Sequence, residues 1–508
     1  MEALIQVLNG FSVSLQPHNL WYTFIGVLMG TVIGVLPGIG PSAAMALLIP
    51  FCYDLSPTSA LIMMAGIYYG AQYGGAITSI LINTPGESSS VMTAIDGYQM
   101  ARKGRAGAAL AISAWGSFIG GTLGVVALTL LAVPLTTMAL GFGPAEYFML
   151  MLVAMTAVLS LTGQSPAKGM LSTMLGLAIA TVGTDLQSGQ IRYVPGIPEL
   201  QEGIDFIIVV IGLFAVGEVF HALEEGISDR SEIIRLKGKL MLNREEWRRS
   251  VKPLARGSLI GFLVGVLPGA GATIASIMSY SVEKNSSRHP EEFGKGAIEG
   301  VAGPETANNA ASSGAMVPLL TLGVPGSGST AVLLGAFIMF GIQPGPMLFQ
   351  TKPDLVWGLV NSMYIGNVML LLLNLPLIFI FVRLLYIPKG ILLPIVLVLS
   401  TIGIFAINNN VLELYLCLFF GVLGYVFRKI DVPLAPLVLA VVLGDLMEQS
   451  FRQAMTISGG SLGIFLGSWL TMGLAAIGAG ILGYTFYNSS SRKRRGSRPP
   501  REAVIASK

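Results

Sequence analysis

Long apolar runs, separated by short polar segments, follow one another along almost the whole chain. Typical runs are GVVALTLLAV, NVMLLLLNLPLIFIFV and GILLPIVLVLSTIGIFAI. A helix that crosses a bilayer needs roughly 20 predominantly apolar residues. Counting the runs on this basis predicts an all-α polytopic membrane protein with about 12 transmembrane segments, including re-entrant hairpins and broken helices.

Composition and charge placement fit this interpretation. Hydrophobic residues make up 53% of the 508 residues and charged residues 11%, whereas a soluble protein carries about 25% charged residues. Lys and Arg gather in four polar segments that the positive-inside rule assigns to the cytoplasm: 101–105, 229–256, 427–429 and 491–501. We therefore expect a cytoplasmic C-terminus, with the basic tail serving as a topology anchor rather than as a nucleic-acid or anionic-lipid site.

The apolar pattern is interrupted at matching places in two parts of the chain. GVLPGIGPS at 34–42 returns as GVLPGAGAT at 265–273, which is 231 residues later. GGAITSILINTPGESSS at 74–90 aligns with GAMVPLLTLGVPGSGST at 314–330, which is 240 residues later. This predicts two repeats with further segments: 1–225 as the first repeat, 226–256 as a charged cytoplasmic linker, 257–430 as the second repeat, 431–485 as additional C-terminal helices and 486–508 as a basic cytoplasmic tail.

The distribution of basic residues between matching loops predicts that the two repeats are inverted. The loop at 284–295 contains Lys and Arg, whereas its counterpart at 53–59 contains neither. Conversely, the basic loop at 102–105 matches an uncharged one at 342–345. Since basic loops stay in the cytoplasm, matching loops are expected on opposite sides of the membrane.

The interruptions themselves point to function. Pro lacks a backbone N–H and Gly lacks stiffness, so a Pro-Gly pair breaks a helix. Broken backbone in a bilayer is tolerated only where it is buried in protein or lines a watery cavity. A single kink is a packing feature, but two kinds of break repeated in register point to the midplane site of a transporter. Because 257–281 has two cytoplasmic ends, we expect a re-entrant hairpin turning at Pro268-Gly269, with its inverted twin turning at Pro37-Gly38.

Each kind of break offers its own chemistry. Ser and Thr after the second kind are expected to cap a new half-helix, whose free N–H groups and dipole suit a carboxylate or phosphate. Carbonyl groups freed at the Gly-rich turns suit Na⁺. The candidate substrate-binding residues lie at the second kind of break and in the polar segment 303–314: Asn83, Thr84, Pro85, Gly86, Ser88, Ser89, Ser90, Asn308, Asn309, Ser313, Pro325, Gly326, Ser327, Ser329 and Thr330. The candidate Na⁺ ligands are Gly38, Gly40, Ser42, Gly269, Gly271 and Thr273.

A few ionisable residues interrupt the apolar runs. Glu305 is either a proton carrier or a residue at a helix start, and we favour the second interpretation. Asp445, Glu448 and Arg452 share one helix face, which predicts an internal ion pair near a membrane boundary. Glu218 ends an apolar run and is expected to face the cytoplasm.

Several functional classes are disfavoured. The chain contains no Gly-Lys-Ser/Thr triplet, so it has no P-loop to use ATP. Its three histidines lie near predicted loops, which argues against a buried metal or haem site. Cys52 and Cys417 stand far apart in apolar surroundings and are expected to be inert core residues. We expect no cofactor and no enzymatic activity.

Six stretches together resemble one family. They are the two GVLPG(I/A)G blocks, NTPGESSSVMTAIDGYQMARKGRAGAAL at 83–110, GPETANNAASSGAMVPLLTLGVPGSGSTAVLLGAF at 303–337, GLFAVGEVF at 212–220 and LGDLMEQSFRQAMTISGG at 443–460. They resemble the large membrane subunit of the bacterial tripartite tricarboxylate transporters, the TctA family. The resemblance extends over about residues 15–480 and identifies the family rather than a substrate.

This resemblance implies a protein of the bacterial inner membrane with two partners: a small membrane subunit of about four helices and a periplasmic solute-binding protein. A homodimer of the membrane complex is a further partner expectation. It also implies secondary transport of citrate or other small carboxylates, driven by Na⁺ or H⁺. Few basic residues lie at membrane depth, which favours Na⁺ as the coupling ion. The alternative is a passive anion channel, and neither the cargo nor a sliding or rocking motion follows from the sequence.

Overall fold

The structure, a computed structural model, describes residues 2–36, 38–161, 165–185, 188–225, 234, 240–269 and 271–496. Predictions about Pro37, Ala270, residues 226–233 and 235–239 of the predicted linker (226–256) and residues 497–508 of the predicted tail (486–508) lie outside these residues. The described chain is mainly helical, and the strands β1 (Gly183–Thr184) and β2 (Ile191–Arg192) pair antiparallel. The all-α prediction is confirmed.

The helices before the linker are α1 (Glu2–Ser14), α2 (Pro17–Gly34), α3 (Pro41–Leu48), α4 (Pro57–Ile82), α5 (Val91–Met100), α6 (Ala106–Ala139), α7 (Pro144–Leu161), α8 (Pro166–Ala180), α9 (Phe206–Val210) and α10 (Gly217–Glu225). Short 3-10 turns are η1 (Ile49–Cys52), η2 (Ser88–Ser90) and η4 (Pro198–Glu202), and π-helical turns are η3 (Ala101–Arg105) and η5 (Ile211–Val216). Several helices begin with Pro, whose missing N–H costs nothing in the first turn.

The helices after the linker are α11 (Arg244–Val266), α12 (Gly271–Ser286), α13 (Glu299–Leu322), α14 (Gly328–Met339), α15 (Pro346–Thr351), α16 (Pro353–Asn374), α17 (Ile378–Leu384), α18 (Lys389–Asn408), α19 (Val411–Lys429), α20 (Leu434–Ile457) and α21 (Trp469–Gly496). The 3-10 turns in this part are η6 (Pro290–Glu292) and η7 (Leu462–Leu466).

Five helical stretches among the described residues are long and apolar enough to cross a membrane: Ser88–Ala139, Phe206–Glu224, Pro353–Asn374, Val411–Lys429 and Leu434–Ile457. Shorter apolar helices accompany them, such as Pro41–Cys52 and Gly328–Met339, which belong to the interrupted segments. The chain is therefore a multi-pass membrane protein, and the number of crossings stays a prediction.

The same close helix contact occurs in both halves of the chain. In the α2–α4 pair, a Cβ placed on Gly30 would lie 2.4 Å from the carbonyl oxygen of Ile67. In the α11–α13 pair, a Cβ on Gly261 would lie 2.3 Å from the carbonyl oxygen of Ala307. Only glycine permits such an approach. The two contacts are related by the offsets of 231 and 240 residues seen in the sequence, so the repeat is present in the packing, while its bounds and its inversion in the membrane stay predictions.

In each half the Gly-rich turn joins two helices that run back along each other, α2 and α3 in the first half and α11 and α12 in the second. Arg256 of α11 forms an ion pair with Glu283 of α12, so the two helices run back along each other from the turn between them. In the first half, Ser59 Oγ donates to Asn19 Oδ1 at 2.7 Å. This bond places the start of α4, which follows the first hairpin, beside the start of α2.

One carboxylate fastens the second hairpin to the first half. Asp96 of α5 accepts hydrogen bonds from three backbone N–H groups of the loop after α12, at 2.9, 2.7 and 2.9 Å for Gly294, Gly296 and Ala297. The Tyr280 hydroxyl donates to the same carboxylate at 2.8 Å. The half-helix α5 and the second hairpin are thereby joined as one unit.

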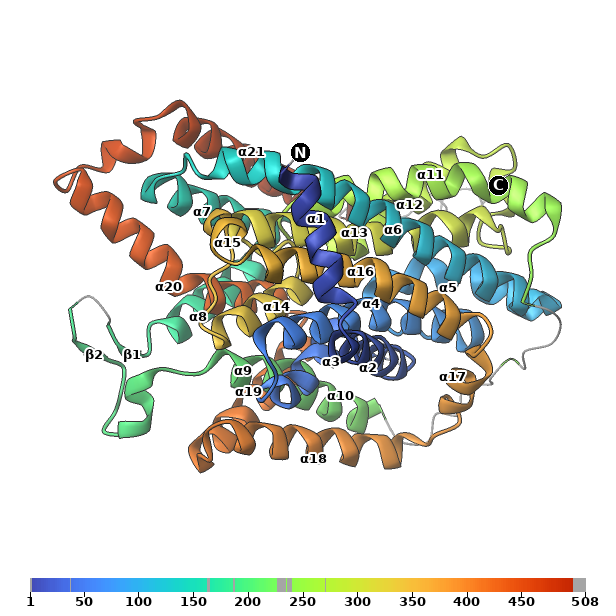
Figure 1. Cartoon of the computed structure of the whole chain (residues 1–508), viewed down its shortest axis with the longest axis horizontal. Helices are drawn as coiled ribbons and strands as arrows, with labels where there is room; N and C mark the ends of the chain where they lie inside the picture. Colours follow the sequence, from blue (N-terminus) through green and yellow to red (C-terminus); the bar gives the residue numbers. More distant parts are fainter. Residues whose placement is uncertain are drawn as a thin grey trace, which may run out of the picture.

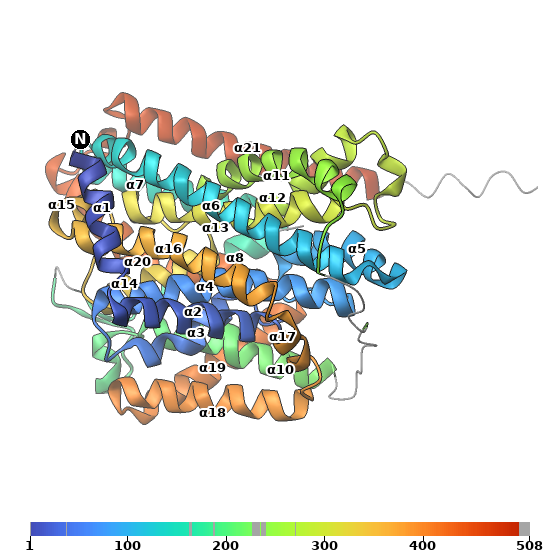
Figure 2. The same ribbon diagram turned by 45° about the vertical axis from the view of Figure 1, so that its right-hand side comes forward.

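The long helices run side by side in both views (Figures 1 and 2). The strand hairpin β1–β2 lies at one end of the bundle, at the left of Figure 1, while the end of α5 and the start of α11 lie at the opposite end. An ion pair of 2.7 Å between Arg105 and Glu246 joins those two helix ends. The basic segments at 101–105 and 244–256 therefore meet at one end of the molecule.

Candidate functional site

The second kind of break has the same backbone form in both halves. α4 ends at Ile82 and is followed by Asn83 with a φ of 55°; α13 ends at Leu322 and is followed by Gly323 with a φ of 72°. A left-handed residue at this place stops a helix and reverses its direction. The pairs Pro85-Gly86 and Pro325-Gly326 then prevent the helix from resuming at once.

A capping box starts each new half-helix. The Ser327 hydroxyl accepts from the Thr330 N–H at 3.2 Å, and the Thr330 hydroxyl accepts from the Ser327 N–H at 2.8 Å. In the first half, Glu87 occupies the cap position and Ser90 completes the box. The prediction of Ser and Thr caps is thus confirmed for the second half, whereas in the first half the cap is a glutamate.

The turn of each hairpin meets the break of the other half. The hydroxyls of Ser42 and Ser329 lie 3.0 Å apart, and those of Ser88 and Thr273 lie 2.7 Å apart. Within each half the turn also lies beside the break: a Cβ on Gly40 would be in ordinary van der Waals contact with Glu87 Cβ, at 3.7 Å. A Cβ on Gly271 would lie at the same distance from Ser327 Cβ. Four interruptions that are far apart in sequence therefore converge on one region.

The breaks also bind the turns of their own half. The N–H of Gly269 donates to the carbonyl of Gly326 at 2.9 Å. Gly86 packs so tightly that a Cβ would lie 2.5 Å from Gly75 Cα and 2.6 Å from the Gly34 carbonyl oxygen. These backbone contacts fix the two hydroxyl pairs relative to each other.

A carboxylate that the sequence analysis did not select stands in this region. Glu87 accepts from the Ser89 hydroxyl and from Asn308 Nδ2, the latter at 3.2 Å. Gln72 lies beside them: its amide nitrogen donates to Glu87 and to the Ser89 hydroxyl, the latter at 3.2 Å, and its amide oxygen accepts from the Ser312 hydroxyl at 3.1 Å. The alignment of the two repeats could have identified this carboxylate, because Glu87 stands at the position that Ser327 occupies in the second half.

Not every candidate residue reaches this region. Asn308 does, through Glu87, but Asn309 donates to the Glu305 carbonyl and Ser313 to the Gly121 carbonyl of α6, at 3.1 Å each. Both residues thus lie on another face of α13. The exposed Asn83 serves as the left-handed helix end.

The position of Glu305 differs from the helix start that we favoured from the sequence. α13 begins at Glu299, so Glu305 lies well inside the helix rather than at its start. It is fully buried and accepts from Thr93 of α5 and from Ser117 of α6, the second at 3.2 Å. Its carboxylate therefore links α13 to two neighbouring helices.

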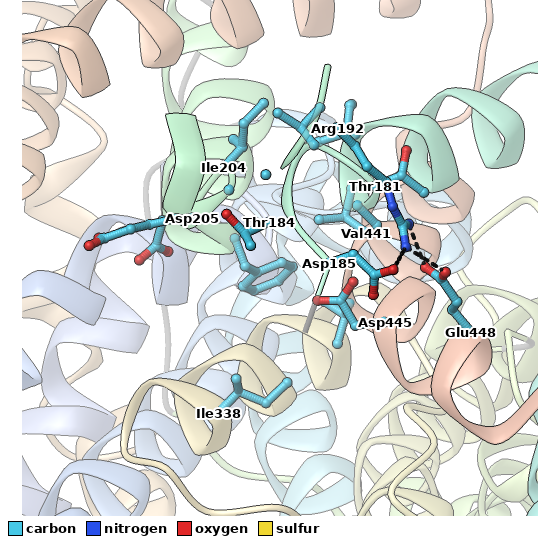
Figure 3. Close-up of a pocket in the computed structure, with 18 of the residues that line it drawn as sticks. Thr181, Thr184, Asp185, Arg192, Ile204, Asp205, Ile338, Val441, Asp445 and Glu448 are labelled. Carbon is cyan, nitrogen blue, oxygen red and sulfur yellow. Dashed lines mark hydrogen bonds and ion pairs between the residues drawn. The ribbon is translucent and has the colours of Figure 1, made fainter. Parts of the chain in front are cut away.

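Two connected cavities open towards the second break. One, of about 720 Å³, reaches Gly323 and Val324. It shares Asp445 and Gln449 with a neighbouring cavity of about 450 Å³ beneath the strand hairpin. Figure 3 shows the smaller cavity, lined by residues of the strand hairpin and of α20. The two cavities together lead from the end of the molecule where β1 and β2 lie to the second break.

The ion pair predicted on α20 lines the smaller cavity. Glu448 bonds Arg452 one turn on, and Arg192 of β2 binds Glu448 with both guanidinium nitrogens at 3.0 Å each. Asp185 joins the cluster through Arg192 at 2.6 Å, and these carboxylates raise the pKa of the Arg192 guanidinium above its ordinary value. Figure 3 shows Arg192 bridging from the hairpin to Glu448. The sequence pattern predicted the Glu448–Arg452 pair on α20 but gave no indication that Asp185 and Arg192 of the strand hairpin join it.

The side chains that converge at the breaks are hydroxyls, amides and one carboxylate. Such groups can bind a carboxylate anion through donated hydrogen bonds and a hard cation through oxygen atoms, as the helix ends also can. The hydroxyls now bond each other across the two halves, so a bound solute would take over these bonds.

Comparison with known proteins assigns a family. Residues 20–439 match the tripartite tricarboxylate transporter TctA family. The chain is 48% identical over 478 residues to the "Uncharacterized 52.8 kDa protein in TAR-I ttuC' 3'region" of Agrobacterium vitis, covering 94% of this chain and 95% of that protein. It is 49% identical over 218 residues to the "Uncharacterized protein in TAR-II ttuC' 3'region" of the same organism, covering 43% of this chain and 90% of that protein. No solved structure matches.

Proposed function

Since this chain belongs to the tripartite tricarboxylate transporter TctA family, we propose that it is the large membrane subunit of an ion-coupled importer. Its cargo is citrate or a related small carboxylate, and its coupling ion is Na⁺. A periplasmic solute-binding protein delivers the cargo, and a small membrane subunit of about four helices completes the complex. The chain lies in the bacterial inner membrane with its C-terminus in the cytoplasm.

The convergence of the four breaks carries this proposal. The hydroxyl pairs Ser42–Ser329 and Ser88–Thr273 each join a turn of one half to a half-helix start of the other. Substrate carboxylates would bind the half-helix starts, where N–H groups and the helix dipole favour an anion. A Na⁺ ion bound close to the turns and to the Glu87 carboxylate would offset part of the negative charge of the substrate, since basic residues are absent from the described turns and breaks.

The structure favours a particular moving unit for alternating access. Asp96 and the Ser88–Thr273 pair tie the first half-helix to the second hairpin. We propose that these elements move together against the remaining helices, by sliding or by rocking. Such a motion would preserve the Ser88–Thr273 contact, which lies within the unit, and would shift it relative to the Ser42–Ser329 pair, which lies outside the unit.

Uptake of radiolabelled citrate into proteoliposomes that contain the three-component complex tests the proposal. We expect accumulation above the external concentration when Na⁺ is high outside, and loss of accumulation when K⁺ replaces Na⁺. Equally fast uptake without a Na⁺ gradient would refute the assignment of the ion. Saturation-free equilibration with no accumulation would instead identify the alternative, a passive anion channel.

Paired variants test the site. Ser89→Ala and Ser329→Ala should each reduce citrate uptake without reducing the amount of folded protein. Ser281→Ala on α12 is a matched control, because the exposed Ser281 hydroxyl bonds only the Ile277 carbonyl of its own helix, at 2.9 Å. Wild-type kinetics in both site variants would refute the proposed placement of the substrate.

A further inference from the structure

A third cavity adjoins the first break from another direction. It has a volume of about 210 Å³, and its lining includes Gly38 of the first turn and Thr84 and Pro85 of the first break. Ligand pockets for drug-sized molecules measure about 300–1,000 Å³, so this space suits a small ion. Apolar side chains of α18 form much of the remaining wall.

Two charged side chains form the floor of this cavity. Glu218 of α10 and Arg428 of α19 make an ion pair, with the Glu218 side chain 9% exposed and the Arg428 side chain 34% exposed. α10 and α18 lie along the same edge of the bundle in both views (Figures 1 and 2). Arg428 is the only Lys or Arg among the described residues that line the cavity.

The first turn rests directly on this ion pair. Gly38 has a φ of 87°, and a Cβ at that position would lie 2.6 Å from Glu218 Oε1. Any displacement of the turn therefore changes the space available to the Glu218 carboxylate. The ion pair is in this way coupled mechanically to one of the four interruptions that converge at the substrate region.

The cavity lies on the side that the positive-inside rule assigns to the cytoplasm. Arg428 and Lys429 form one of the basic segments of the sequence. Lys168, at the start of α8, donates to the Ile430 carbonyl just beyond them, at 2.5 Å. The cavities near the second break, in contrast, adjoin the strand hairpin at the other end of α8.

We infer that this cavity is a carboxylate-binding site on the cytoplasmic release path, in which a substrate carboxylate replaces Glu218 on Arg428. A guanidinium presents two parallel N–H donors that match a carboxylate. The exchange keeps the Arg428 guanidinium paired with a carboxylate, while the displaced Glu218 carboxylate has to gain a proton or another partner, because an unpaired buried charge is costly. The inference rests on the proposed function, since it requires a carboxylate that leaves the first break towards the cytoplasm.

A second ion pair between the same helices provides a matched control. Glu224 of α10 pairs with Lys429 of α19, and the Tyr425 hydroxyl donates to Glu224 at 2.9 Å. Both side chains are about half exposed and neither lines the cavity. If ion pairs merely clamp α10 to α19, variants of the two pairs should behave alike.

Transport kinetics measured from each side provide the first test. With the complex in vesicles of either orientation, Arg428→Gln should raise the KM for citrate at the cytoplasmic side at least tenfold. The KM at the periplasmic side should stay within twofold of wild type. Glu218→Gln should lower the cytoplasmic KM, since Arg428 then lacks its competitor, and Lys429→Gln should change neither value. Equal changes on both sides, or equal behaviour of Arg428→Gln and Lys429→Gln, would overturn the inference.

A labelling assay separates this inference from the proposed function. Ala222 lines the cavity, and the native Cys52 and Cys417 are buried. We expect citrate to slow maleimide labelling of Ala222→Cys in inside-out vesicles, and this protection to disappear when Arg428→Gln is added. Protection that persists without Arg428 overturns the inference even if citrate is transported. Arg428-dependent protection in vesicles that show no coupled transport would support the site and contradict the proposed function.

Discussion

The glycine contacts between the paired helices allow a quantitative test of the internal repeat. In Gly261→Ala, the new Cβ would lie 2.3 Å from the Ala307 carbonyl oxygen and 2.6 Å from Ala307 Cα. Ordinary Cα–H···O contacts have carbon–oxygen distances of about 3.3–3.6 Å. The helices α11 and α13 would therefore have to separate by roughly 1 Å. The obstacle is backbone, which cannot rotate away as a side chain can.

The expected free energy follows from two opposing effects. Overpacking of a tight interior costs about 1–3 kcal/mol, and an immovable carbonyl places this variant near the upper value. Alanine is intrinsically better than glycine in a helix by about 1 kcal/mol. We therefore expect Gly261→Ala to lose about 2 kcal/mol of stability.

A matched control isolates the contact. Gly480 lies on the exposed α21, and a Cβ there would meet nothing within 4 Å. Gly480→Ala should therefore gain up to about 1 kcal/mol, so the two variants should differ by about 3 kcal/mol.

Thermal unfolding of the purified chain in detergent, followed by loss of the monodisperse peak in size-exclusion chromatography, measures this difference. Gly30→Ala, whose Cβ would lie 2.4 Å from the Ile67 carbonyl oxygen, should behave like Gly261→Ala. If Gly261→Ala melted at or above the temperature of Gly480→Ala, the reasoning from close helix contact would be refuted.

Three further outcomes are expected. Glu87→Gln should leave the melting temperature near wild type and weaken Na⁺-dependent citrate uptake, and unchanged Na⁺ dependence would remove Glu87 from the cation site. Asp96→Asn should lower the melting temperature, because hydrogen bonds to a charged group contribute about 1.5–3 kcal/mol each and Asn can replace them only in part; a wild-type melting curve would contradict this. Arg249 lowers the pKa of the Glu292 carboxyl below its ordinary value of 4.5. The ion pair therefore stabilises the fold fully above pH 4.5, and this stabilisation is lost as the pH falls through the lowered pKa. Glu292→Gln should therefore lose stability near pH 7, by at most about 1 kcal/mol for so exposed a pair, and should match wild type in melts at strongly acid pH.

Much of the fold could be predicted because the repeated motifs contain residues that determine the backbone conformation of their own segment. A Pro-Gly pair breaks a helix wherever it stands, so the ends of α11 and α13 follow from the sequence at Val266 and Leu322. The offsets of 231 and 240 residues then identified which breaks in the two halves are equivalent. Both inferences need only neighbouring residues and a comparison of the chain with itself.

The contacts across the two halves could not be predicted in the same way. That Ser42 meets Ser329 and Ser88 meets Thr273 depends on how the halves pack. Glu87 was missed because a glutamate beside three serines is also typical of an exposed helix start. Asn309 and Ser313 were included because a polar segment does not reveal which helix face each residue occupies.

The crossed arrangement, in which each half supplies the turn for the other half's break, has a consequence for biogenesis. A ribosome adds about 5–20 residues per second, so the 185 residues between Ser88 and Thr273 take about 9–37 s to synthesise. Throughout that interval the first Pro-Gly break is inserted without Thr273, its partner hydroxyl. Until the second half arrives, the Ser88 hydroxyl of the nascent first half must therefore be covered by water, lipid head groups or the insertion machinery.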